Sequence, residues 1–384
     1  MTLTETAGEF KIKSSHGVDV VNAAFKTEGY VVNEKGGKLE LQPVTLPPMT
    51  ATMVQVKIQM VSLCHTDVHM RDNDMGISDY PMLLGHEGVG VVTHLGSAVR
   101  TLKIGDTVGI GWIRDSCTGC RRCKEGRENL CENGYQAIYL SSSAGPIGKS
   151  PLQYNLHGGC FARYQRIEER FAVKIPDGVP PEMASPLLCG GATVFEPLCD
   201  YVTAGAHVGV LGIGGLGTAA VKLARLRGCI VWAISGTPSK REGILQAGAH
   251  HFVNLGDKEA RRKATGKLDL IIDTSPINPA VDQLLELLAL NGTLCKVGVP
   301  LSTDCTYSGD WRNLIFCQRK LVGSGSCGTK RLDDMMELVA ANMDFMKDID
   351  GWKTEHLPMS KVNEAMDLLQ NRKNAAYRYV LEWK

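Results

Sequence analysis

Four cysteines, Cys117, Cys120, Cys123 and Cys131, lie close together in the segment CTGCRRCKEGRENLC. At this spacing the four thiolates can converge on one ion, and zinc prefers four such ligands in a tetrahedron. A coordination sphere closed by four thiolates leaves no position for water or substrate, so this zinc is expected to be structural. Two disulfides are one alternative, and an iron–sulfur cluster is another, because C-x2-C-x2-C also occurs in ferredoxins.

A second set of metal-binding side chains is spread over the segments LCHTDVH, LLGHEGVG and SPLLCGG, which supply Cys64, His86 and Cys189. Two thiolates and one imidazole make a three-ligand zinc site with one open position, as catalytic zinc requires. Their wide separation along the chain means that spacing alone does not show that they converge. The same segments carry further hydroxyl, imidazole and carboxylate groups: Thr66, Asp67, His69 and Glu87.

A glycine-rich segment, LGIGGLG, places Gly212, Gly214 and Gly217 in the pattern G-x-G-x-x-G. It follows the apolar segment HVGVLG, a predicted strand, and opens the predicted helix LGTAAVKLARLRG, which is the context that gives the pattern its meaning. The glycines let the backbone approach a pyrophosphate, and the helix N-terminus offers free N–H groups to the phosphates. The segment therefore predicts a dinucleotide site.

The residues after the next predicted strand bear on which dinucleotide is bound. An NAD-binding fold usually has Asp or Glu at this position to hold the ribose 2′-hydroxyl. Here the strand ends at Ser235, and the segment continues with hydroxyls at Thr237 and Ser239 and cations at Lys240 and Arg241. Because a carboxylate would repel a 2′-phosphate and the cations would attract it, we expect NADP(H). The alternative is that the two cations merely open the next helix on its solvent side.

The two halves of the chain differ in their pattern. The first half is rich in β-branched segments bounded by turn residues, such as MVQVKIQMV, GVGVVTHLG and DTVGIGW. After about residue 190, apolar strands alternate with helices, including PAVDQLLELLAL and DWRNLIFCQR. This alternation predicts an α/β fold with a parallel sheet covered on both faces, and six predicted strands fit a doubly wound dinucleotide-binding domain.

Composition limits the classes of function. The chain has 384 residues and a net charge of +1, so no bulk electrostatic field favours nucleic acid or membrane binding. The N-terminal segment MTLTETAGEFKIKSSHG has no apolar region typical of a secretory signal, and no apolar run is long enough to span a membrane. We expect a cytoplasmic protein, and in that reducing setting thirteen cysteines favour metal ligands and buried thiols over disulfides.

The motifs CHTDVH, GHEGVG, the four-cysteine segment, PLLCGGATV and LGIGGLG occur in the order seen in zinc-dependent medium-chain alcohol dehydrogenases. From about Ala24 onward the chain resembles that family, most closely its cinnamyl alcohol dehydrogenase branch, with features of the yeast-type enzymes. Residues 1–20 look like an unmatched extension. The resemblance implies a β-rich GroES-like catalytic domain (1–189, with the zinc lobe near 115–133), a six-stranded Rossmann domain (190–326) and a return to the catalytic domain (327–384).

The resemblance also assigns a role to each group around the catalytic metal. Cys64, His86 and Cys189 would hold the catalytic zinc, and Glu87 would lie behind it as an occasional fourth ligand. Asp67 would orient the imidazole of His86, a role that zinc-binding histidines usually need filled.

Proton transfer and the second zinc are implied in the same way. Thr66 and His69 would form a proton relay, through the nicotinamide ribose, to solvent. The cysteines of the four-cysteine segment would hold a structural zinc, which disfavours the iron–sulfur alternative.

For the cofactor, the resemblance places His65 and Arg378 at the pyrophosphate. Together with the glycine-rich turn and the segment after Ser235, the predicted cofactor-binding residues are His65, Thr66, Thr193, Gly212, Ile213, Gly214, Gly215, Leu216, Gly217, Ser235, Thr237, Ser239, Lys240, Thr274, Gly298, Ser324, Gly325, Ser326 and Arg378.

The activity implied is reduction of a zinc-bound aldehyde by NADPH, with either cinnamyl-type or aliphatic substrates. Gln136, Gly325 and Ser326 stand where the aromatic-alcohol enzymes carry a tryptophan and large apolar residues. Trp112 precedes the lobe instead and is expected to shape the substrate pocket, as in the yeast-type enzymes. The alternatives are an NAD(H)-dependent small-alcohol dehydrogenase and a non-catalytic cofactor-binding paralogue. The partners expected are a small-molecule substrate and a second copy of the chain, joined through the sheet edges.

Overall fold

The computed structural model describes residues 12–13, 19–20, 23–139, 158–276, 280–299, 309–347, 353–371 and 377–384. Most of the predicted N-terminal extension, and the segment 140–157, lie outside the described residues. Within the extension, the structure describes only the short antiparallel pair β1 (Ile12–Lys13) and β2 (Asp19–Val20).

The first half of the chain folds mainly into antiparallel sheets, as its β-branched segments predict. One sheet of three strands has the order β4 (Leu39–Leu46), β3 (Phe25–Val32), β6 (Met82–Leu83). A seven-stranded sheet has the order β12 (Ala172–Lys174), β8 (Thr107–Ile110), β7 (Gly88–Leu95), β5 (Met53–Ser62), β20 (Tyr377–Glu382), β19 (Lys353–Pro358), with β11 (Tyr164–Glu168) also paired to β5. A small ribbon pairs β9 (Ile113–Ser116) with β10 (Tyr135–Ala137).

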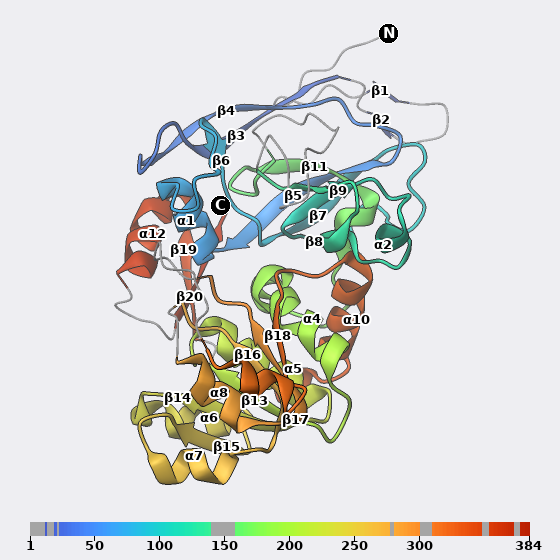
Figure 1. Ribbon diagram of the computed structural model, residues 1–384. Coiled ribbons are helices and arrows are strands. Elements are labelled where there is room, and N and C mark those ends of the chain that lie inside the picture. The colour runs from blue at the N-terminus through green and yellow to red at the C-terminus, as the bar shows by residue number, and fades with distance from the viewer. Residues whose placement is uncertain are drawn as a thin grey trace.

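The last strand of the chain joins this early sheet. In β20, Val380, Leu381 and Glu382 pair antiparallel with Ser62, Val61 and Met60 of β5. The C-terminal strand therefore belongs to the β-rich part of the molecule, which is built mainly from the first half of the chain (Figure 1).

The second half contains a six-stranded sheet in which all neighbouring strands run parallel. Its order is β15 (His251–Asn254), β14 (Ile230–Ser235), β13 (His207–Leu211), β16 (Leu268–Asp273), β17 (Leu288–Lys296), β18 (Lys320–Gly323). The order reverses direction beside β13, as in a doubly wound dinucleotide-binding fold, so the crevice for a ligand lies at the carboxyl ends of β13 and its neighbours. The predicted fold class is confirmed.

Helices cover both faces of this sheet. The strands contact α4 (Ala192–Tyr201) and α5 (Gly215–Leu226) on one face, and α7 (Lys258–Ala264) and α8 (Val281–Leu287) on the other. Shorter helices are α6 (Arg241–Gln246) and α9 (Trp311–Ile315). Near the C-terminus follow α10 (Thr329–Ala340), α11 (Met343–Lys347) and α12 (Val362–Gln370).

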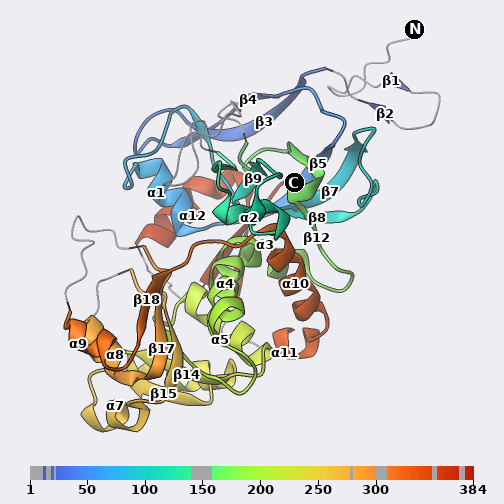
Figure 2. The same cartoon turned by 45° about the vertical axis from the view of Figure 1, so that its right-hand side comes forward.

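The two parts meet at a continuous helical run made of α3 (Pro181–Pro186), a π-helical turn (Leu187–Gly191) and α4. Here α3 contacts β5 and β7, and α4 contacts α5 and α10. In both ribbon views α4 and α10 lie at the junction of the β-rich part and the parallel sheet (Figures 1 and 2). The predicted boundary at residues 189/190 falls inside this run, and the proposed domain limits remain a prediction.

Two predicted helices are shorter than expected. The segment PAVDQLLELLAL is helical only over Val281–Leu287, because Leu288 already pairs with Leu268 in the parallel sheet. The segment DWRNLIFCQR is helical only over Trp311–Ile315. Tertiary strand pairing overrides the local helical pattern in the first case.

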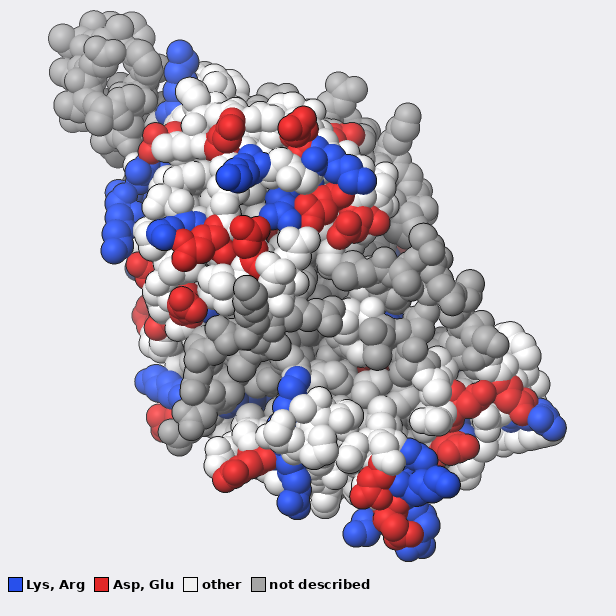
Figure 3. Space-filling view, turned by 90° about the vertical axis from the view of Figure 1, so that its left-hand side faces the viewer, with Lys and Arg blue, Asp and Glu red and all other residues white. Residues whose placement is uncertain are grey.

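The surface carries mixed charge. Figure 3 shows lysine and arginine interspersed with aspartate and glutamate over the face in view. Within the described part of the chain, no helix is both long enough and apolar enough to cross a membrane.

Candidate active site

A short helix that the sequence did not predict, α1 (His65–Asp72), carries several of the predicted catalytic residues. Its N-cap is Cys64 in extended backbone, and the Asp67 side chain reaches back to accept a hydrogen bond from the Cys64 N–H at 3.2 Å. The other Asp67 oxygen accepts from the Gly85 N–H at 3.0 Å, directly before His86. One buried carboxylate thus fixes two segments that are distant in sequence.

The structure brings Cys64, His86, Glu87 and Cys189 together. One ligand atom from each lies within 4.8 Å of the others. Cys64 caps α1, His86 and Glu87 precede β7, and Cys189 lies in the π-helical turn before α4. Single π-helical turns within helices occur often at functional sites. The convergence that spacing could not establish is therefore present in the structure.

The hydrogen bonds of His86 favour a metal at this point. Its ring is fully buried, and its Nδ1 lies 3.1 Å from an Asp67 oxygen and 3.2 Å from the Tyr139 hydroxyl. Its Nε2 is buried and makes no hydrogen bond to any residue that the structure describes. With the Nδ1 proton directed to Asp67, the Nε2 lone pair is free to bind a cation, which is the usual arrangement of a zinc-binding histidine.

The two thiols of the cluster are electrostatically coupled. The hydrogen bond from Cys189 holds the pKa of Cys64 well below its usual range, and His86 acts in the same direction against the effect of burial. The same hydrogen bond, together with burial, raises the pKa of Cys189. One thiolate is thus available without a metal, and a divalent cation would favour the second. The donor set fits zinc.

Glu87 lies at the back of this cluster. Burial raises the pKa of its carboxyl to about 8, the charge of Cys64 acts in the same direction, and His86 and Arg378 oppose it. Its carboxylate accepts a hydrogen bond from the Ser62 hydroxyl, and Ser185 donates to its backbone oxygen at 2.5 Å. Neither serine was predicted, since isolated serines carry no signal in the sequence.

Three aromatic or imidazole rings pack edge to face beside the cluster. The Trp112 ring centroid lies 5.4 Å from that of His86 and 5.4 Å from that of Tyr139, at nearly perpendicular angles. The Trp112 indole donates to the Tyr135 hydroxyl at 3.2 Å. Trp112 therefore borders the candidate metal site, and its role in shaping the substrate pocket remains a prediction. Tyr139 was not predicted.

The proposed relay residues lie on α1. The Thr66 hydroxyl is 3.6 Å from the Cys64 sulfur, at the edge of the metal cluster. His69 follows one turn later, on the same helix face, and its Nδ1 lies 2.9 Å from Asp74 Oδ2. His65 is exposed, and its ring centroid lies 6.2 Å from that of His69.

The glycine-rich turn has the form that a pyrophosphate needs. Gly212 has φ +88°, and a Cβ at Gly217 would lie 1.9 Å from the Gly212 oxygen, so both positions require glycine. A Cβ at Gly214 would meet nothing within 4 Å, which leaves open space at the N-cap of α5. The Arg378 guanidinium donates to the Gly215 oxygen at 2.6 Å, which places a cation at this open turn.

Further predicted cofactor residues lie at the carboxyl ends of the strands. The Thr274 hydroxyl donates to the Gly212 oxygen at 2.7 Å, and Gly298 follows β17. The Ser326 N–H donates to the Thr193 hydroxyl at 3.1 Å, joining α4 to the segment after β18. The Ser324 hydroxyl is buried and has no hydrogen-bond partner among the described residues, and a Cβ at Gly325 would meet open space.

The segment after β14 contacts the glycine-rich turn through Lys240. Ser235 ends the strand, and its hydroxyl accepts from the Thr237 N–H at 3.1 Å. The Lys240 ammonium donates to the Ile213 oxygen at 2.7 Å, so it lies against the glycine-rich turn. Thr237 and Ser239 are exposed, and Leu216 lies on the first turn of α5.

The four lobe cysteines form a second cluster, with all four sulfurs within 4.8 Å of one another. The N–H groups of Cys120 and Cys123 point at the sulfurs of Cys117 and Cys120 at 3.4 and 3.5 Å. The cysteines are free rather than paired in disulfides. Four converging sulfurs fit a closed zinc site.

A buried carboxylate ties this lobe to the rest of the molecule. Glu128, fully buried, accepts from Arg170 at 2.7 Å and from the N–H of Thr329, at the start of α10, at 2.9 Å. Arg170 also donates to the Cys123 oxygen at 2.5 Å. The lobe is therefore fixed to the element that follows the parallel sheet.

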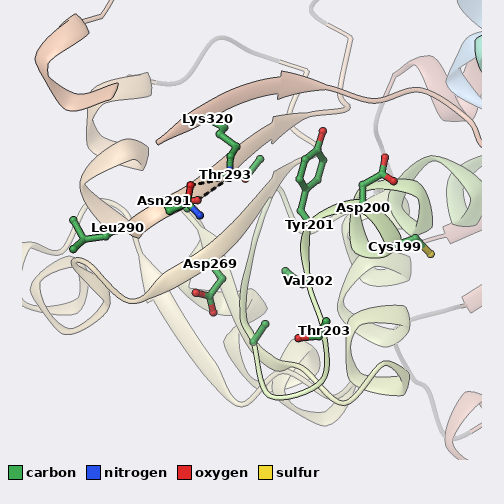
Figure 4. A pocket seen from close by; sticks show the side chains of 12 residues that line it. Cys199, Asp200, Tyr201, Val202, Thr203, Asp269, Leu290, Asn291, Thr293 and Lys320 are labelled. Carbon is green, nitrogen blue, oxygen red and sulfur yellow. Dashed lines mark hydrogen bonds between the residues drawn. The ribbon is translucent and has the colours of Figure 1, made fainter. Parts of the chain in front are cut away.

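A cavity of about 560 Å³ lies elsewhere, between the end of α4 and the start of β17. Figure 4 shows its lining, which includes Asp200, Asp269 and Lys320, the last of these bonded to Asn291. None of the predicted site residues lines it. It opens at the end of the sheet opposite the glycine-rich turn and is separate from the candidate active site.

Two family models match the chain. The alcohol dehydrogenase GroES-like domain matches residues 50–177, and the zinc-binding dehydrogenase model matches residues 215–341. The matches correspond to the β-rich part and to the parallel sheet described above.

Similar proteins and structures point to one branch of this family. Cinnamyl alcohol dehydrogenase 1 of Ocimum basilicum is 35% identical over 93% of this chain and 96% of its own. A solved cinnamyl alcohol dehydrogenase of Sorghum bicolor is 31% identical, with a TM-score of 0.81 over 93% of this chain and 97% of its own. CAD of Helicobacter pylori, solved in complex with NADP(H), is 27% identical, with a TM-score of 0.78 over 94% of this chain and 98% of its own. The chain belongs to the zinc-dependent medium-chain alcohol dehydrogenases, in their cinnamyl alcohol dehydrogenase branch.

Proposed function

We propose that this protein is a zinc-dependent, NADP(H)-linked alcohol dehydrogenase that acts as an aldehyde reductase. The observation that carries the proposal is the buried Nε2 of His86, which lacks a hydrogen-bond partner in the described structure and faces the Cys64 and Cys189 sulfurs. Cys64, His86 and Cys189 would hold one zinc, with Glu87 behind it. The four lobe cysteines would hold the second.

The chemistry divides between the bound groups and the chain. Zinc supplies a Lewis acid for the carbonyl oxygen, and NADPH supplies the hydride. Asp67 keeps the Nδ1 proton of His86 in place and so presents the Nε2 lone pair. The Trp112 and Tyr139 rings narrow the space beside His86 and exclude water from that side.

Reduction of an aldehyde to an alcohol also needs one proton. The Thr66 hydroxyl lies at the edge of the metal cluster and can pass a proton toward His69. His69 is partly exposed and bonded to Asp74, and an imidazole at such a position can exchange protons with water. This route needs no acid within the buried cluster.

Three observations support NADPH over NADH. The strand β14 ends in Ser235 and not in a carboxylate, so nothing at that position repels a 2′-phosphate. Lys240, in the segment after Ser235, lies against the glycine-rich turn, where its positive charge would attract a 2′-phosphate. The related Helicobacter pylori protein was solved with NADP(H). The NAD(H)-dependent alternative has no comparable support.

The relatives and the side chains around the candidate metal site support a proposal for the substrate class. The relatives are named for cinnamyl alcohol, and mannitol dehydrogenase of Apium graveolens is also 36% identical over 86% of this chain. Trp112 limits the space beside His86, whereas Gly325 leaves open space near the strand ends. We propose a fairly broad aldehyde reductase that accepts cinnamyl-type and aliphatic aldehydes.

The proposal is tested by following NADPH absorbance with cinnamaldehyde, an aliphatic aldehyde and an unrelated ketone. We expect turnover of both aldehydes, and a lower KM for NADPH than for NADH. The variant Ser235→Asp should reverse that preference, because it places a carboxylate beside the 2′ position. Far faster turnover of the ketone, or equal use of NADH, would contradict the proposal.

We also propose a homodimer and a cytoplasmic location. Among the described residues, β18 is the last strand of the parallel sheet, and large apolar side chains are exposed around it: Leu290, Trp311, Ile315, Phe316 and Leu321. An exposed apolar patch beside an unpaired strand edge is typical of an interface. A second copy of the chain, paired through this edge, would cover it.

A further inference from the structure

A partly buried polar cluster lies at the carboxyl ends of β16 and β17, outside the predicted site. It consists of Asp273, the last residue of β16, Ser275 two positions later, and Lys296, the last residue of β17. Asp273 and Lys296 are paired in register across the two strands. We call these three residues the Asp273 clamp.

The contacts within the clamp are short and numerous. Lys296 Nζ lies 2.8 Å from Asp273 Oδ2 and donates to the Ser275 backbone oxygen at 2.7 Å. The other carboxylate oxygen, Oδ1, accepts from the Ser275 N–H at 2.9 Å and from its hydroxyl at 2.6 Å. The Asp273 side chain is only 3% exposed and that of Lys296 is 27% exposed. The clamp thus fixes the backbone turn from Asp273 to Ser275 from both sides.

This turn is in direct contact with the glycine-rich turn. Between the clamp residues, the Thr274 hydroxyl donates to the Gly212 oxygen at 2.7 Å and to the Leu211 oxygen at 2.9 Å. A Cβ on Gly212 would lie 3.0 Å from the Ser275 nitrogen. A displacement of the turn would therefore move the backbone that receives the pyrophosphate.

The clamp also borders the residue after β17. The Gly298 N–H donates to the backbone oxygen of Asp273 at 3.0 Å, and a Cβ on Gly298 would lie 2.3 Å from the backbone oxygen of Ser275. Both Gly212 and Gly298 are predicted cofactor-binding residues, and both pack on the same turn.

Charge gives the lysine a second role. A lone carboxylate at this edge would repel the two phosphates of a dinucleotide that lies across the strand ends. Lys296 offsets the Asp273 charge by pairing with Oδ2 at 2.8 Å, while Oδ1 accepts the hydrogen bonds from Ser275.

We propose that Asp273, Ser275 and Lys296 are positioning residues for the dinucleotide, acting through Thr274 on the glycine-rich turn. The inference rests on the proposed NADP(H)-linked function and adds residues that set cofactor affinity without touching the reacting atoms. Its consequence is that the clamp determines how tightly the cofactor binds, whereas the zinc cluster determines how fast the bound substrate reacts.

The test uses the full-length, zinc-loaded protein and its variant Lys296→Met. We expect the dissociation constant for NADPH, measured by fluorescence titration, to rise about tenfold, which corresponds to a loss of about 1.4 kcal/mol of binding free energy. KM for NADPH should rise in parallel, with kcat unchanged. The double variant Lys296→Met/Asp273→Asn should regain part of the affinity, because it removes the uncompensated carboxylate.

The matched control is Lys320→Met, the same change at an exposed lysine on the neighbouring strand β18, where the ammonium contacts Asn291. It should leave NADPH affinity unchanged. If Lys296→Met lowers the melting temperature while NADPH binds as tightly as to the wild type, the clamp is only structural and the inference is wrong. Failure of the proposed function looks different: the wild type would bind the dinucleotide but reduce no aldehyde.

Discussion

Among single residues, Tyr139 contacts the candidate metal site although no sequence motif marks it. It is fully buried, its hydroxyl lies 3.2 Å from His86 Nδ1, and burial and the charge of Asp67 raise its pKa, so it stays protonated. Like Asp67, it contacts the Nδ1 side of the His86 ring, and we expect both groups to orient the imidazole. No motif marks it, because a tyrosine in a strand-like segment is usually core packing.

The variant Tyr139→Phe should weaken zinc at the catalytic site by about tenfold, because outer contacts to a metal-binding histidine have effects of this size. Competition with a chelator, followed by measurement of the zinc that remains per chain, checks this. Tyr135→Phe is the control, since its hydroxyl contacts Trp112 and not His86. Equal zinc retention in Tyr139→Phe and wild type would refute the role.

Trp112 is expected to limit the size of the substrate. Its ring packs edge-on against that of His86, so replacement with alanine opens space beside the candidate zinc site. Trp112→Ala should raise kcat/KM for bulky aromatic aldehydes relative to short aliphatic ones. The ratio of kcat/KM across an aldehyde series measures it, and an unchanged ratio would count against the assignment.

The ligand residues themselves were predictable because their segments are specific in type and order. Cys64, His86 and Cys189 were named from the sequence, and the structure brings them within one cluster. The supporting groups were not. Ser62, Ser185 and Tyr139 reach the site only through tertiary packing, which single residue types do not encode.

At the scale of elements, the regular strands were the predictable part. The six strands of the parallel sheet are predicted from short segments that alternate with helices, and all six are found. The helix α1 was missed because it has only eight residues and is capped by Cys64 and Asp67 in place of the usual serine or threonine. The π-helical turn at Leu187–Gly191 has no sequence signature either.

The zinc lobe is held to α10 through Glu128, and its anchoring can be tested by stability. Glu128→Ala leaves Arg170 and the N-terminus of α10 without their buried partner, which should cost roughly 3 kcal/mol of unfolding free energy. Urea denaturation of the zinc-loaded protein measures the loss.

Glu132→Ala, a lobe residue with a side chain about half exposed, is the control for this change. It should unfold at the wild-type urea concentration. If Glu128→Ala did so as well, the lobe would be anchored by other contacts.

At the scale of the whole molecule, the exposed apolar side chains near β18 call for a partner surface. Phe316 is 79% exposed and Trp311 is 67% exposed. Phe316→Glu should convert a dimer into a monomer, because it places a charge among these exposed apolar side chains. Sedimentation analysis at several concentrations checks this.

Ile104→Glu is the matched control, since Ile104 is also an exposed apolar residue but lies in the β-rich half. It should remain a dimer. A wild-type protein that sediments as a monomer at all concentrations would refute the proposal that a second copy of the chain covers these side chains.

We propose that the reaction takes place at Cys64, His86 and Cys189, while the lobe cysteines hold a metal that takes no part in it. Zinc content per chain, measured for wild type and Cys189→Ser alongside NADPH-dependent reduction of cinnamaldehyde, tests this most directly. We expect two zincs per chain and activity in the wild type, and one zinc per chain with activity lost in the variant. A Cys189→Ser protein that retains both zincs and reduces the aldehyde at the wild-type rate would contradict it.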